Sequence, residues 1–327
     1  MIMTTTTTRV GIVGYGNIAR GAEIALQAAD DMELVAIFSR RSGITSASGT
    51  PVFTMDQIPS FQDKIDVMIL CGGSANDLME QGLEIGRYFH VIDSFDTHAK
   101  IEEHFTGMDR VAKAAGKVAL ISMGWDPGLF SLMRLLGEAA LPHGKNYTFW
   151  GRGISQGHSN AIRRIPGVAD AKQYTVPKEE YLERARNGEM SDFTAQESHL
   201  RECYVVLENG ADQARVENEI RHLKNYFEGY ETEIHFISQE ELDRDHAAMP
   251  HGGFVLRVGE TQPQEAQVIE YNLRLASNPN FTSSVIIAYT RALMRMAAEG
   301  KTGCITIFDV PPAYLLAKTP EEIRHLL

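Results

Sequence analysis

The chain has 327 residues, which is long enough for two domains that each bury a hydrophobic core. Its composition, 43% hydrophobic and 23% charged, is that of a globular protein, and a net charge of −12 with no basic stripe argues against nucleic acid as a partner. Cys71, Cys203 and Cys304 form no C-x-x-C motif, which predicts a cytoplasmic protein. No apolar run is long enough to span a membrane. The leader Met1–Thr8 lacks the features of a signal peptide, and we expect its threonine run to be a frayed end.

The first elements form a βαβ unit with a glycine-rich turn. A β-branched strand at Val10–Val13 leads into Gly14 and Gly16, and Ala19 occupies the third position of G-x-G-x-x-G/A. Such a turn lets a pyrophosphate approach the N–H groups of the next helix. An ordinary strand–turn–helix fits the same glycines, but a second strand at Met32–Phe38 favours a dinucleotide site. The residues predicted to contact the cofactor in this turn are Gly14, Tyr15, Gly16, Asn17 and Ile18.

The second strand ends in Ser39, Arg40 and Arg41. Proteins that bind NAD place an acidic residue here for the ribose 2′-hydroxyl. Two guanidiniums and a hydroxyl are suited instead to a 2′-phosphate. A solvated basic turn is the alternative, but the position at the strand end favours NADP as the cofactor.

Strands and helices alternate through residue 123, which predicts an α/β Rossmann-type doubly wound parallel sheet. The further strands expected here are Pro51–Phe53, Asp66–Cys71, Phe89–Asp93 and Lys117–Ser122, and the helices are Ala75–Tyr88 and Ile101–Ala115. Ligands collect at the carboxyl ends of such strands. We therefore predict further cofactor contacts at Cys71, Gly72, Gly73, Ser74, Asp93, Ser94 and Phe95.

The rhythm changes after a helix at Leu129–Ala140, and residues 124–278 predict an α+β substrate and dimerisation domain. We expect an open, mainly antiparallel sheet with helices on one face. Its strands are expected at Tyr147–Gly151, Lys172–Val176, Ser198–Leu207, Glu231–Ile237, Gly253–Val258 and Ala266–Ala276. Its helices are expected at Lys178–Arg186, Ala211–His222 and Gln239–Asp245, and its loops at Gln156–Ser159 and Asn278–Phe281. A helix at Asn280–Ala298 and a strand at Gly303–Phe308 follow, and we expect residues 279–327 to pack back on the first domain, 1–123.

Acidic residues follow two of the parallel strands. Asp93 and Asp96 flank one strand end, and Asp126 follows the next. Converging carboxylates beside a nicotinamide suit an amine substrate, because an ammonium must lose a proton before its carbon releases hydride. Asp126 has an equally good structural interpretation as the N-cap of a helix with Pro127 at its first position.

The second domain offers fewer distinctive residues. His251 lies between proline and glycine, and Arg201 and Thr175 lie within predicted strands. A covered arginine head must find an anion, although an exposed strand face would equally explain Arg201. No metal-binding motif and no nucleophile elbow occurs.

In this order the motifs resemble the meso-diaminopimelate D-dehydrogenase family nearly from end to end. The matching motifs are V-G-Y-G-N-I at Val13–Ile18, I-F-S-R-R at Ile37–Arg41, G-W-D-P-G at Gly124–Gly128, F-W-G-R-G-I-S-Q-G-H-S at Phe149–Ser159, R-R-I-P-G-V at Arg163–Val168, M-P-H-G-G at Met249–Gly253 and N-P-N-F-T at Asn278–Thr282. The resemblance implies NADP-dependent oxidative deamination at the D-centre of meso-2,6-diaminopimelate, giving L-2-amino-6-oxopimelate and ammonia, on the route to lysine.

The resemblance also implies roles for individual residues and a homodimer formed through the second domain. Asp96 and Asp126 match aspartates beside the substrate amine. Phe95 stands where some members have a tyrosine, so a hydroxyl contact near the nicotinamide is expected to be absent. The residues that match substrate contacts are Trp150, Gln156, Gly157, Thr175, Arg201, His251 and Asn278.

Two other functions remain open from the residues themselves. One is an NADP-dependent amino-acid dehydrogenase or imine reductase with a different substrate. The other is a non-catalytic NADP-binding sensor that dimerises through its second domain.

Overall fold

The computed structural model describes residues 7–327, and the chain folds into two compact units. Unit 1 comprises Met1–Leu132 and Pro279–Leu327, and unit 2 comprises Met133–Asn278. The first division falls inside helix α4 (Leu129–Ala140). The expected frayed end lies outside the described residues except for Thr7 and Thr8, and Thr8 begins strand β1.

Unit 1 contains a seven-stranded sheet of order β14-β6-β5-β4-β1-β2-β3, in which every pair is parallel. The predicted doubly wound parallel sheet is therefore confirmed. Its strands are β1 (Thr8–Val13), β2 (Met32–Phe38), β3 (Val52–Phe53), β4 (Val67–Leu70), β5 (His90–Asp93), β6 (Val118–Leu120) and β14 (Gly303–Ile305). The last of these comes from the C-terminal segment and pairs with β6.

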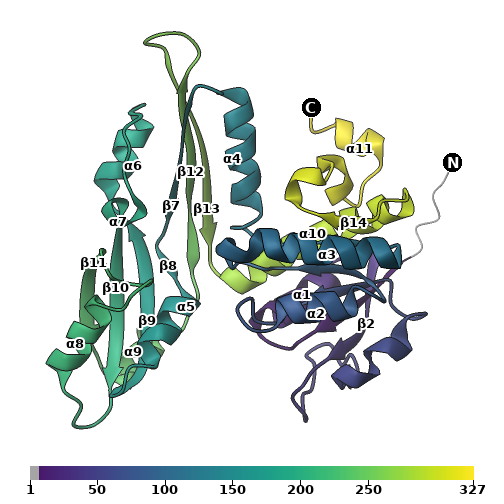
Figure 1. Ribbon diagram of the computed structural model, residues 1–327, viewed down its shortest axis with the longest axis horizontal. Helices are drawn as coiled ribbons and strands as arrows, with labels where there is room; N and C mark the ends of the chain where they lie inside the picture. The colour runs from purple at the N-terminus through teal and green to yellow at the C-terminus, as the bar shows by residue number, and fades with distance from the viewer. Residues whose placement is uncertain (1–6) are drawn as a thin grey trace. The chain divides into compact units, whose positions relative to one another are not determined.

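Helices cover both faces of this sheet because its strands bury apolar side chains on both sides. Val10 and Ile12 of β1 point into a core shared with α1 (Asn17–Gln27) and α10 (Asn278–Ala298), whereas Val13 points into the opposite core. That second core is closed by α2 (Leu78–Ile85) and α3 (Ile101–Ala115) (Figure 1). The helices pack on the two faces of the sheet, so the carboxyl ends of the strands are bordered by the connecting loops.

The contact between α1 and α10 depends on Gly21, which the sequence did not single out. A Cβ at this position would lie 2.6 Å from Ser283 Oγ and 3.1 Å from the Cα of Asn280. Glycine therefore lets the two helices approach closely. The hydroxyl of Ser283 also donates to the Ile18 carbonyl at 2.7 Å, so α10 fixes the first turn of α1.

Several predicted elements of unit 1 are shorter than expected, including the strand predicted at Lys117–Ser122, which is β6, Val118–Leu120. The helix predicted at Ala75–Tyr88 is α2, Leu78–Ile85, because the N–H groups of Asn76 and Asp77 turn back to the Gly73 carbonyl. The strand predicted at Gly303–Phe308 stops at Ile305, where a 3-10 turn over Ile307–Asp309 takes over.

Unit 2 contains two sheets, where the sequence predicted a single open one. A four-stranded sheet has the order β11-β10-β9-β8 and a three-stranded sheet has the order β13-β12-β7. All pairs are antiparallel except β10 with β11, so the mainly antiparallel character is confirmed. The strands are β7 (Gly144–Trp150), β8 (Gly153–Ile154), β9 (Val168–Pro177), β10 (His199–Leu207), β11 (Glu231–Phe236), β12 (His251–Glu260) and β13 (Ala266–Leu275).

Helices lie on both faces of the four-stranded sheet, which corrects the expectation of one covered face. α5 (Gln156–Arg163) and α8 (Gln213–Arg221) pack on the face that carries Cys203 and Val205. On the other face Tyr204 stacks on His246, which ends α9 (Gln239–Asp245), at 3.9 Å between ring centroids. In the other sheet, α6 (Glu179–Arg186) packs against β7 and β12.

Two predicted loops are helical. Residues 156–159 form the first turn of α5, which Ser155 caps by accepting the N–H of His158. Residues 278–281 form the first turn of α10. Glycine, histidine and asparagine have low helix propensity, which favoured a loop at these positions. A capping residue and the packing of the following turns are nevertheless sufficient to begin a helix. No helix within residues 7–327 is long and apolar enough to cross a membrane.

Candidate functional site

The glycine-rich turn of unit 1 has the geometry that a pyrophosphate requires. Gly14 has a φ of +92°, and its N–H donates to the Phe38 carbonyl at 2.8 Å. A Cβ on Gly14 would lie 3.1 Å from the Cys71 carbonyl oxygen, so only glycine brings the turn this close to β4. Gly16 is the N-cap of α1, has no atom near its missing Cβ, and is followed by a first turn without acidic residues. The N–H groups of this turn, including those of Asn17 and Ile18, therefore fit a bound anion.

Tyr15 lies within this turn but is buried, so its side chain faces the protein interior. Its hydroxyl donates to Glu23 of α1 at 2.7 Å and accepts the N–H of Ala47 at 3.0 Å. Glu23, also buried, accepts the N–H of Ser48 at 2.6 Å through its other oxygen. These bonds attach the loop that follows β2 to the first helix. The cofactor contact predicted for Tyr15 is thus restricted to its main chain.

The basic residues at the end of β2 are close to the glycine-rich turn. The Arg41 guanidinium donates to the Tyr15 carbonyl, and its N–H donates to the Ser39 hydroxyl at 3.1 Å. Arg40 is largely exposed and forms an ion pair of 2.9 Å with Asp77. Sequence reasoning missed Asp77, because the residues around it do not indicate a partner in the loop after β2.

The loop after β4 and the loop after β5 are joined by Ser74. Its hydroxyl oxygen accepts the N–H groups of Asp96 at 2.9 Å and Thr97 at 3.1 Å. Gly72 and Gly73 precede it, and a Cβ on Gly72 would overlap the side chain of Gln81. Burial raises the pKa of the Cys71 thiol to about 12, so this cysteine is a neutral neighbour of the predicted cofactor site.

The contacts predicted for Asp93 and Phe95 need correction. Asp93 is 1% exposed, and its carboxylate accepts two main-chain N–H groups and lies 2.7 Å from His104 Nε2. Phe95 is fully buried and stacks on the same histidine at 4.4 Å. Neither side chain is exposed, so any cofactor contact of Asp93 and Phe95 would be made by their main chains. Ser94, between them, is half-buried.

The two carboxylates assigned to the reaction are accessible. Asp96 is exposed in the loop after β5, and Asp126 is half-buried in the loop after β6. Helix α4 begins at Leu129, so the capping interpretation of Asp126 with Pro127 at the first helical position is wrong. A role as a helix cap therefore does not explain the presence of Asp126 in this loop.

Arg201 is the most informative residue of unit 2. It is 8% exposed, lies on β10 opposite Thr175 of β9, and donates to the Thr175 hydroxyl. Its guanidinium lies over the Tyr230 ring at 4.0 Å. Among the described residues its Nε has no hydrogen-bond partner. Burial lowers the pKa of Arg201, and a buried guanidinium with unused donors is suited to a carboxylate.

Two histidines near Arg201 remain neutral. Burial, reinforced by the positive charge of Arg201 itself, lowers the pKa of His158 to about 4. Burial also lowers the pKa of His199 to about 4, with Arg201 again contributing. The Trp150 N–H donates to Nε2 of His199 at 2.9 Å. The main chain of Trp150 is thereby fixed beside the strand that carries Arg201.

His251 is packed against a glycine. A Cβ on Gly153 would lie 2.3 Å from the imidazole of His251, and Gly153 itself pairs with Thr175. The Gly252 N–H donates to Nδ1 of His251 at 2.9 Å. This contact brings the start of β12 next to the Arg201–Thr175 pair.

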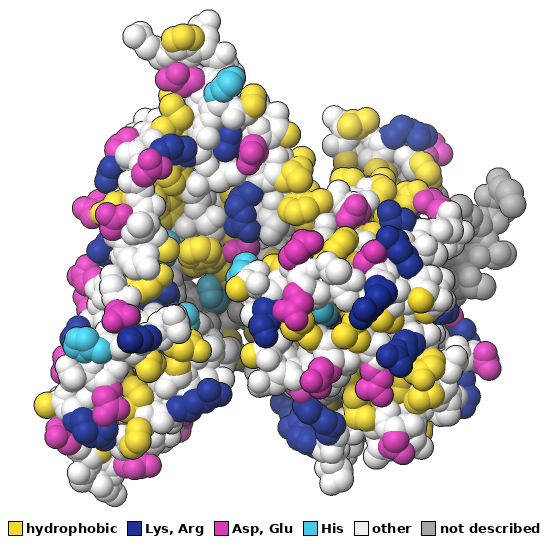
Figure 2. Space-filling view, viewed as in Figure 1, with side chains coloured by type: hydrophobic (Ala, Val, Ile, Leu, Met, Phe, Trp, Pro, Cys, Tyr) yellow, Lys and Arg dark blue, Asp and Glu magenta, His cyan; other side chains and the backbone are white. Residues whose placement is uncertain are grey.

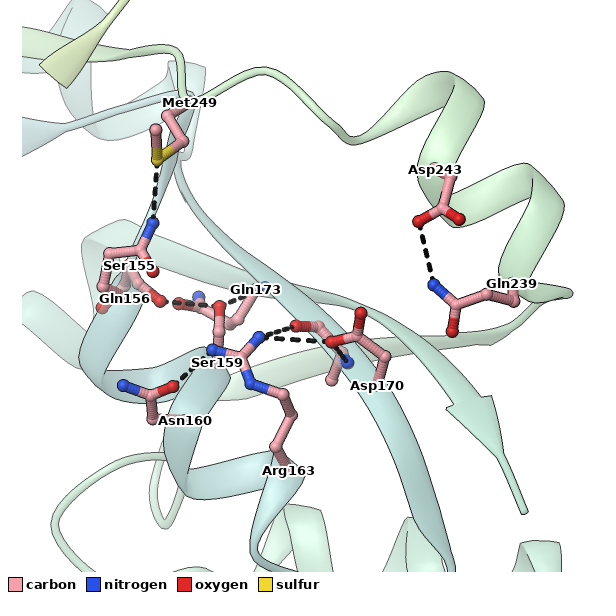
Figure 3. Close-up of polar contacts among 11 residues, drawn as sticks. Ser155, Gln156, Ser159, Asn160, Arg163, Asp170, Gln173, Gln239, Asp243 and Met249 are labelled. Atoms are coloured by element: carbon pink, nitrogen blue, oxygen red, sulfur yellow. Dashed lines mark hydrogen bonds and ion pairs between the residues drawn. The ribbon is translucent and has the colours of Figure 1, made fainter. Parts of the chain in front are cut away.

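The remaining predicted contacts are connected through Met249. The Gln156 amide donates to Met249 Sδ at 3.2 Å at the exposed start of α5 (Figure 3). The Asn278 N–H donates to the Met249 carbonyl at 3.0 Å. Gly157 is exposed with open space around its Cα. Gln156 and Asn278 are thus linked through Met249, which lies two residues before His251.

Within residues 7–327, one further group of charged side chains could hold an ion. Glu202, Glu233 and His235 lie close enough to offer ligands to a metal ion, but Glu202 is paired with Arg152 at 2.8 Å. On the face shown in Figure 2, acidic and basic side chains are interspersed.

The chain is similar to known proteins along nearly its whole length. The family model for the diaminopimelic acid dehydrogenase C-terminal domain matches residues 124–277. The meso-diaminopimelate D-dehydrogenase of Ureibacillus thermosphaericus is 55% identical over 321 residues, covering 98% of each chain. A crystal structure of a meso-DAPDH from Clostridium tetani E88, carrying six substitutions and determined with DAP, is 51% identical with a TM-score of 0.93, covering 98% of this chain and 99% of that one. An engineered D-amino acid dehydrogenase bound to NADP+ is 43% identical with a TM-score of 0.87 and the same coverage.

Proposed function

This chain belongs to the meso-diaminopimelate D-dehydrogenase family, and we infer that it catalyses the reversible oxidative deamination of meso-2,6-diaminopimelate at its D-centre. The products are L-2-amino-6-oxopimelate, ammonia and the reduced nicotinamide cofactor. In the reverse direction, ammonia is added to the keto acid. The reaction serves lysine and diaminopimelate biosynthesis.

We propose NADP as the cofactor. The support is the pair Arg40 and Arg41 at the end of β2, where a ribose 2′-phosphate would be held by two guanidiniums, and the NADP+ bound by the engineered relative. The N–H groups after Gly14 and Gly16 would hold the pyrophosphate. When bound, the nicotinamide supplies the acceptor for the hydride.

The observation that carries the substrate proposal is Arg201, a buried cation whose Nε has no partner among the described residues. It would bind the carboxylate of the L-centre through charge-assisted hydrogen bonds, with Thr175 and His251 beside it. This end of the substrate does not react. Holding it fixes which of the two chemically similar centres can reach the cofactor.

The six substitutions of the Clostridium tetani enzyme support this assignment. They replace a glutamine, a threonine, an arginine, a proline, a histidine and an asparagine. Residues of the same types occur with the same spacing here: Gln156, Thr175, Arg201, Pro250, His251 and Asn278. All but Pro250 belong to the substrate residues predicted from the sequence.

Asp126, assisted by Asp96, would accept the proton from the substrate ammonium and orient the neutral amine. A carboxylate is required because the nitrogen lone pair must be available when the carbon loses hydride. The resulting imine is then hydrolysed by water. The L-centre presents the mirror arrangement, so it cannot place its hydrogen at the cofactor while its remote carboxylate keeps the same partners.

An assay of cofactor reduction with separate stereoisomers tests the proposal. We expect NADPH formation with meso-diaminopimelate and little with the L,L isomer, which has no D-centre. Simple D-amino acids should react poorly because they lack the remote carboxylate. A preference for simple D-amino acids would favour a different dehydrogenase, and tight NADP binding without turnover of any of them would favour a sensor.

We also propose a cytoplasmic homodimer formed through unit 2. All three cysteines are free thiols, as expected in a reducing compartment. Leu136 of α4 and Ile269 of β13 are 50% and 42% exposed and line a shared surface hollow of about 310 Å³. An apolar area of this kind fits a second copy of the chain.

Light scattering of purified protein tests the dimer. We expect Leu136→Glu with Ile269→Glu to convert a dimer into a monomer. Ile24→Glu provides the control, because Ile24 is 57% exposed on α1 of unit 1. A wild-type monomer, or a double variant that remains dimeric, would contradict this interface.

A further inference from the structure

Asp93 and His104 form a pair that is closed off from solvent at the end of β5. Both side chains are 1% exposed, and Asp93 Oδ2 lies 2.7 Å from His104 Nε2. Because Asp93 also accepts two main-chain N–H groups, we assign the proton of this hydrogen bond to Nε2 of His104. A buried carboxylate of this kind is retained only where its hydrogen bonds are made.

The second oxygen of Asp93 connects two loops. Oδ1 accepts the Phe95 N–H at 3.0 Å and the Ser122 N–H at 2.9 Å. Phe95 immediately precedes Asp96, and Ser122 begins the segment that leads to Asp126. The Met123 N–H adds a third bond, to the Asp93 carbonyl, at 2.8 Å. One residue therefore links the main chains that carry both proposed proton acceptors.

The backbone conformation of Ser122 shows how its hydrogen bond to Asp93 affects the course of the chain toward Asp126. Its φ is 59°, in the left-handed region that side chains other than glycine seldom adopt. Its buried Oγ has no hydrogen-bond partner among the described residues, so its side chain does not explain the conformation. The bond from its N–H to Asp93 does stabilise this turn, and the turn sets the direction of the chain toward Asp126.

His104 holds the carboxylate in place from α3. Its imidazole donates to Oδ2 and packs against the Phe95 ring, with 4.4 Å between centroids and a tilt of 33°. Without this donor, Oδ2 would be buried and unpaired, and the carboxylate would rotate away from Phe95 and Ser122.

We infer that Asp93 and His104 are positioning residues for the reaction: together they fix the main-chain separation of Asp96 and Asp126. This inference rests on the proposed function of those two aspartates. Neither positioning residue touches the substrate. They would act by increasing the fraction of time in which the carboxylates of Asp96 and Asp126 are both within reach of the substrate amine.

Two variants of His104 separate positioning from stability. His104→Phe keeps an aromatic ring against Phe95 but removes the donor, and His104→Gln restores an N–H group near the place of Nε2. We expect His104→Phe to lower kcat with meso-diaminopimelate about 10- to 100-fold, since misplacing a reacting group by ~1 Å has effects of this size. The KM for NADP should change less than kcat, because the glycine-rich turn and Arg40–Arg41 lie in loops that follow other strands, β1 and β2. His104→Gln should recover much of the lost kcat.

His90 provides a matched control at the other end of β5, where its Nδ1 accepts the Val118 N–H at 2.9 Å. His90→Phe also removes a bond between β5 and β6, so it should lower Tm while leaving kcat unchanged. Equal losses of kcat in His90→Phe and His104→Phe would mean that general destabilisation is responsible. Unchanged kcat in His104→Phe, with an active wild type, would overturn the inference and leave the proposed function intact.

Crystal structures of the wild type and His104→Phe give a second measurement that needs no turnover. We expect the separation of the Asp96 and Asp126 Cα atoms to change by ~1 Å or more. An unchanged separation would overturn the inference. If the wild type failed to oxidise meso-diaminopimelate, the proposed function would fail, and these structures would still decide whether the pair sets the two loops.

Discussion

Arg201 illustrates how a single residue combines burial, charge and incomplete hydrogen bonding. Its guanidinium is covered by Tyr230 on one side and contacts Thr175 at one end, while Nε lacks a partner among the described residues. A buried charge of this kind raises the free energy of the folded protein unless an anion pairs with it and accepts its remaining hydrogen bonds. The two neighbouring histidines stay neutral, so Arg201 would present a single positive charge to the proposed substrate carboxylate.

Arg201→Met should raise the KM for meso-diaminopimelate about 10- to 200-fold, which corresponds to the ~1.5–3 kcal/mol of a hydrogen bond to a charged group. The KM for NADP should be unchanged. Arg201→Lys should give an intermediate value, because it keeps the charge but loses the planar fork. Arg215→Met, an exposed arginine paired with Glu219 on α8, is the control in steady-state kinetics. A normal KM in the Met variant would contradict the role assigned to Arg201.

Replacing Arg40 and Arg41 together by alanine tests the second arginine group. We expect the KM for NADP to rise at least ~10-fold while the KM for NAD changes little, because only NADP carries the phosphate that these side chains would pair with. Arg87→Ala, an exposed arginine of the same unit, is the control. The measurement is the ratio of kcat/KM for the two cofactors, and an unchanged ratio would refute a 2′-phosphate contact.

At the scale of elements, the loop after β2 is fixed to α1 through a buried carboxylate. Glu23 accepts hydrogen bonds from the Tyr15 hydroxyl and from the N–H of Ser48, and Tyr15 in turn holds Ala47. Although burial acts to raise it, these donors together hold the pKa of Glu23 below its usual value. The loop that begins with Arg40 and Arg41 is therefore attached at its far end to the helix of the glycine-rich turn.

Glu23→Gln would place amide hydrogens against these donors. We expect Tm to fall, with a loss of stability on the order of 1–3 kcal/mol, and the KM for NADP to rise several-fold with little change for NAD. Glu33→Gln, an exposed position on β2, is the matched control. Thermal unfolding and cofactor kinetics are measured together. A lower Tm without any change in cofactor preference would restrict Glu23 to a structural role.

For the whole molecule, histidines that are buried as neutral rings contribute to the dependence of stability on pH. Burial lowers the pKa values of His90, His158 and His199 to about 4. Their pKa in the unfolded chain is about 6.5. Between about pH 4 and about pH 6.5, the unfolded state therefore binds more protons than the folded state. The free energy of unfolding rises with pH in this window, and the stabilisation is lost as the pH falls from about 6.5 toward about 4.

His199→Asn should flatten this pH dependence, because Asn does not titrate. We expect the difference in unfolding free energy between pH 7 and pH 5 to shrink by about 1–2 kcal/mol in denaturant titrations. His98→Asn, at an exposed position, should leave the slope unchanged. An identical slope in the His199 variant would show that this histidine is not responsible for the acid sensitivity.

The sequence by itself determined the parallel sheet, the chain order of its strands and the place of the glycine-rich turn. These features depend on short-range patterns: apolar runs of strand length, glycine at the tight turn, and basic residues at a strand end. The bounds of α3, α4 and α9 were predicted residue for residue, because apolar periodicity defines an amphipathic helix locally. The motifs quoted in the sequence also identified the family to which the chain belongs.

Only the tertiary structure decided which strands of unit 2 pair, which faces their helices cover, and what each polar side chain contacts. The burial of Asp93 against His104, the ion pair of Arg40 with Asp77 and the incomplete hydrogen bonding of Arg201 all join residues from different elements. Local patterns carry no information about such partners. The sequence around a residue is the same whether its side chain contacts solvent, a ligand or another strand. For Asp93 the difference decided its role, since burial removes its side chain from the cofactor and leaves it holding two loops together.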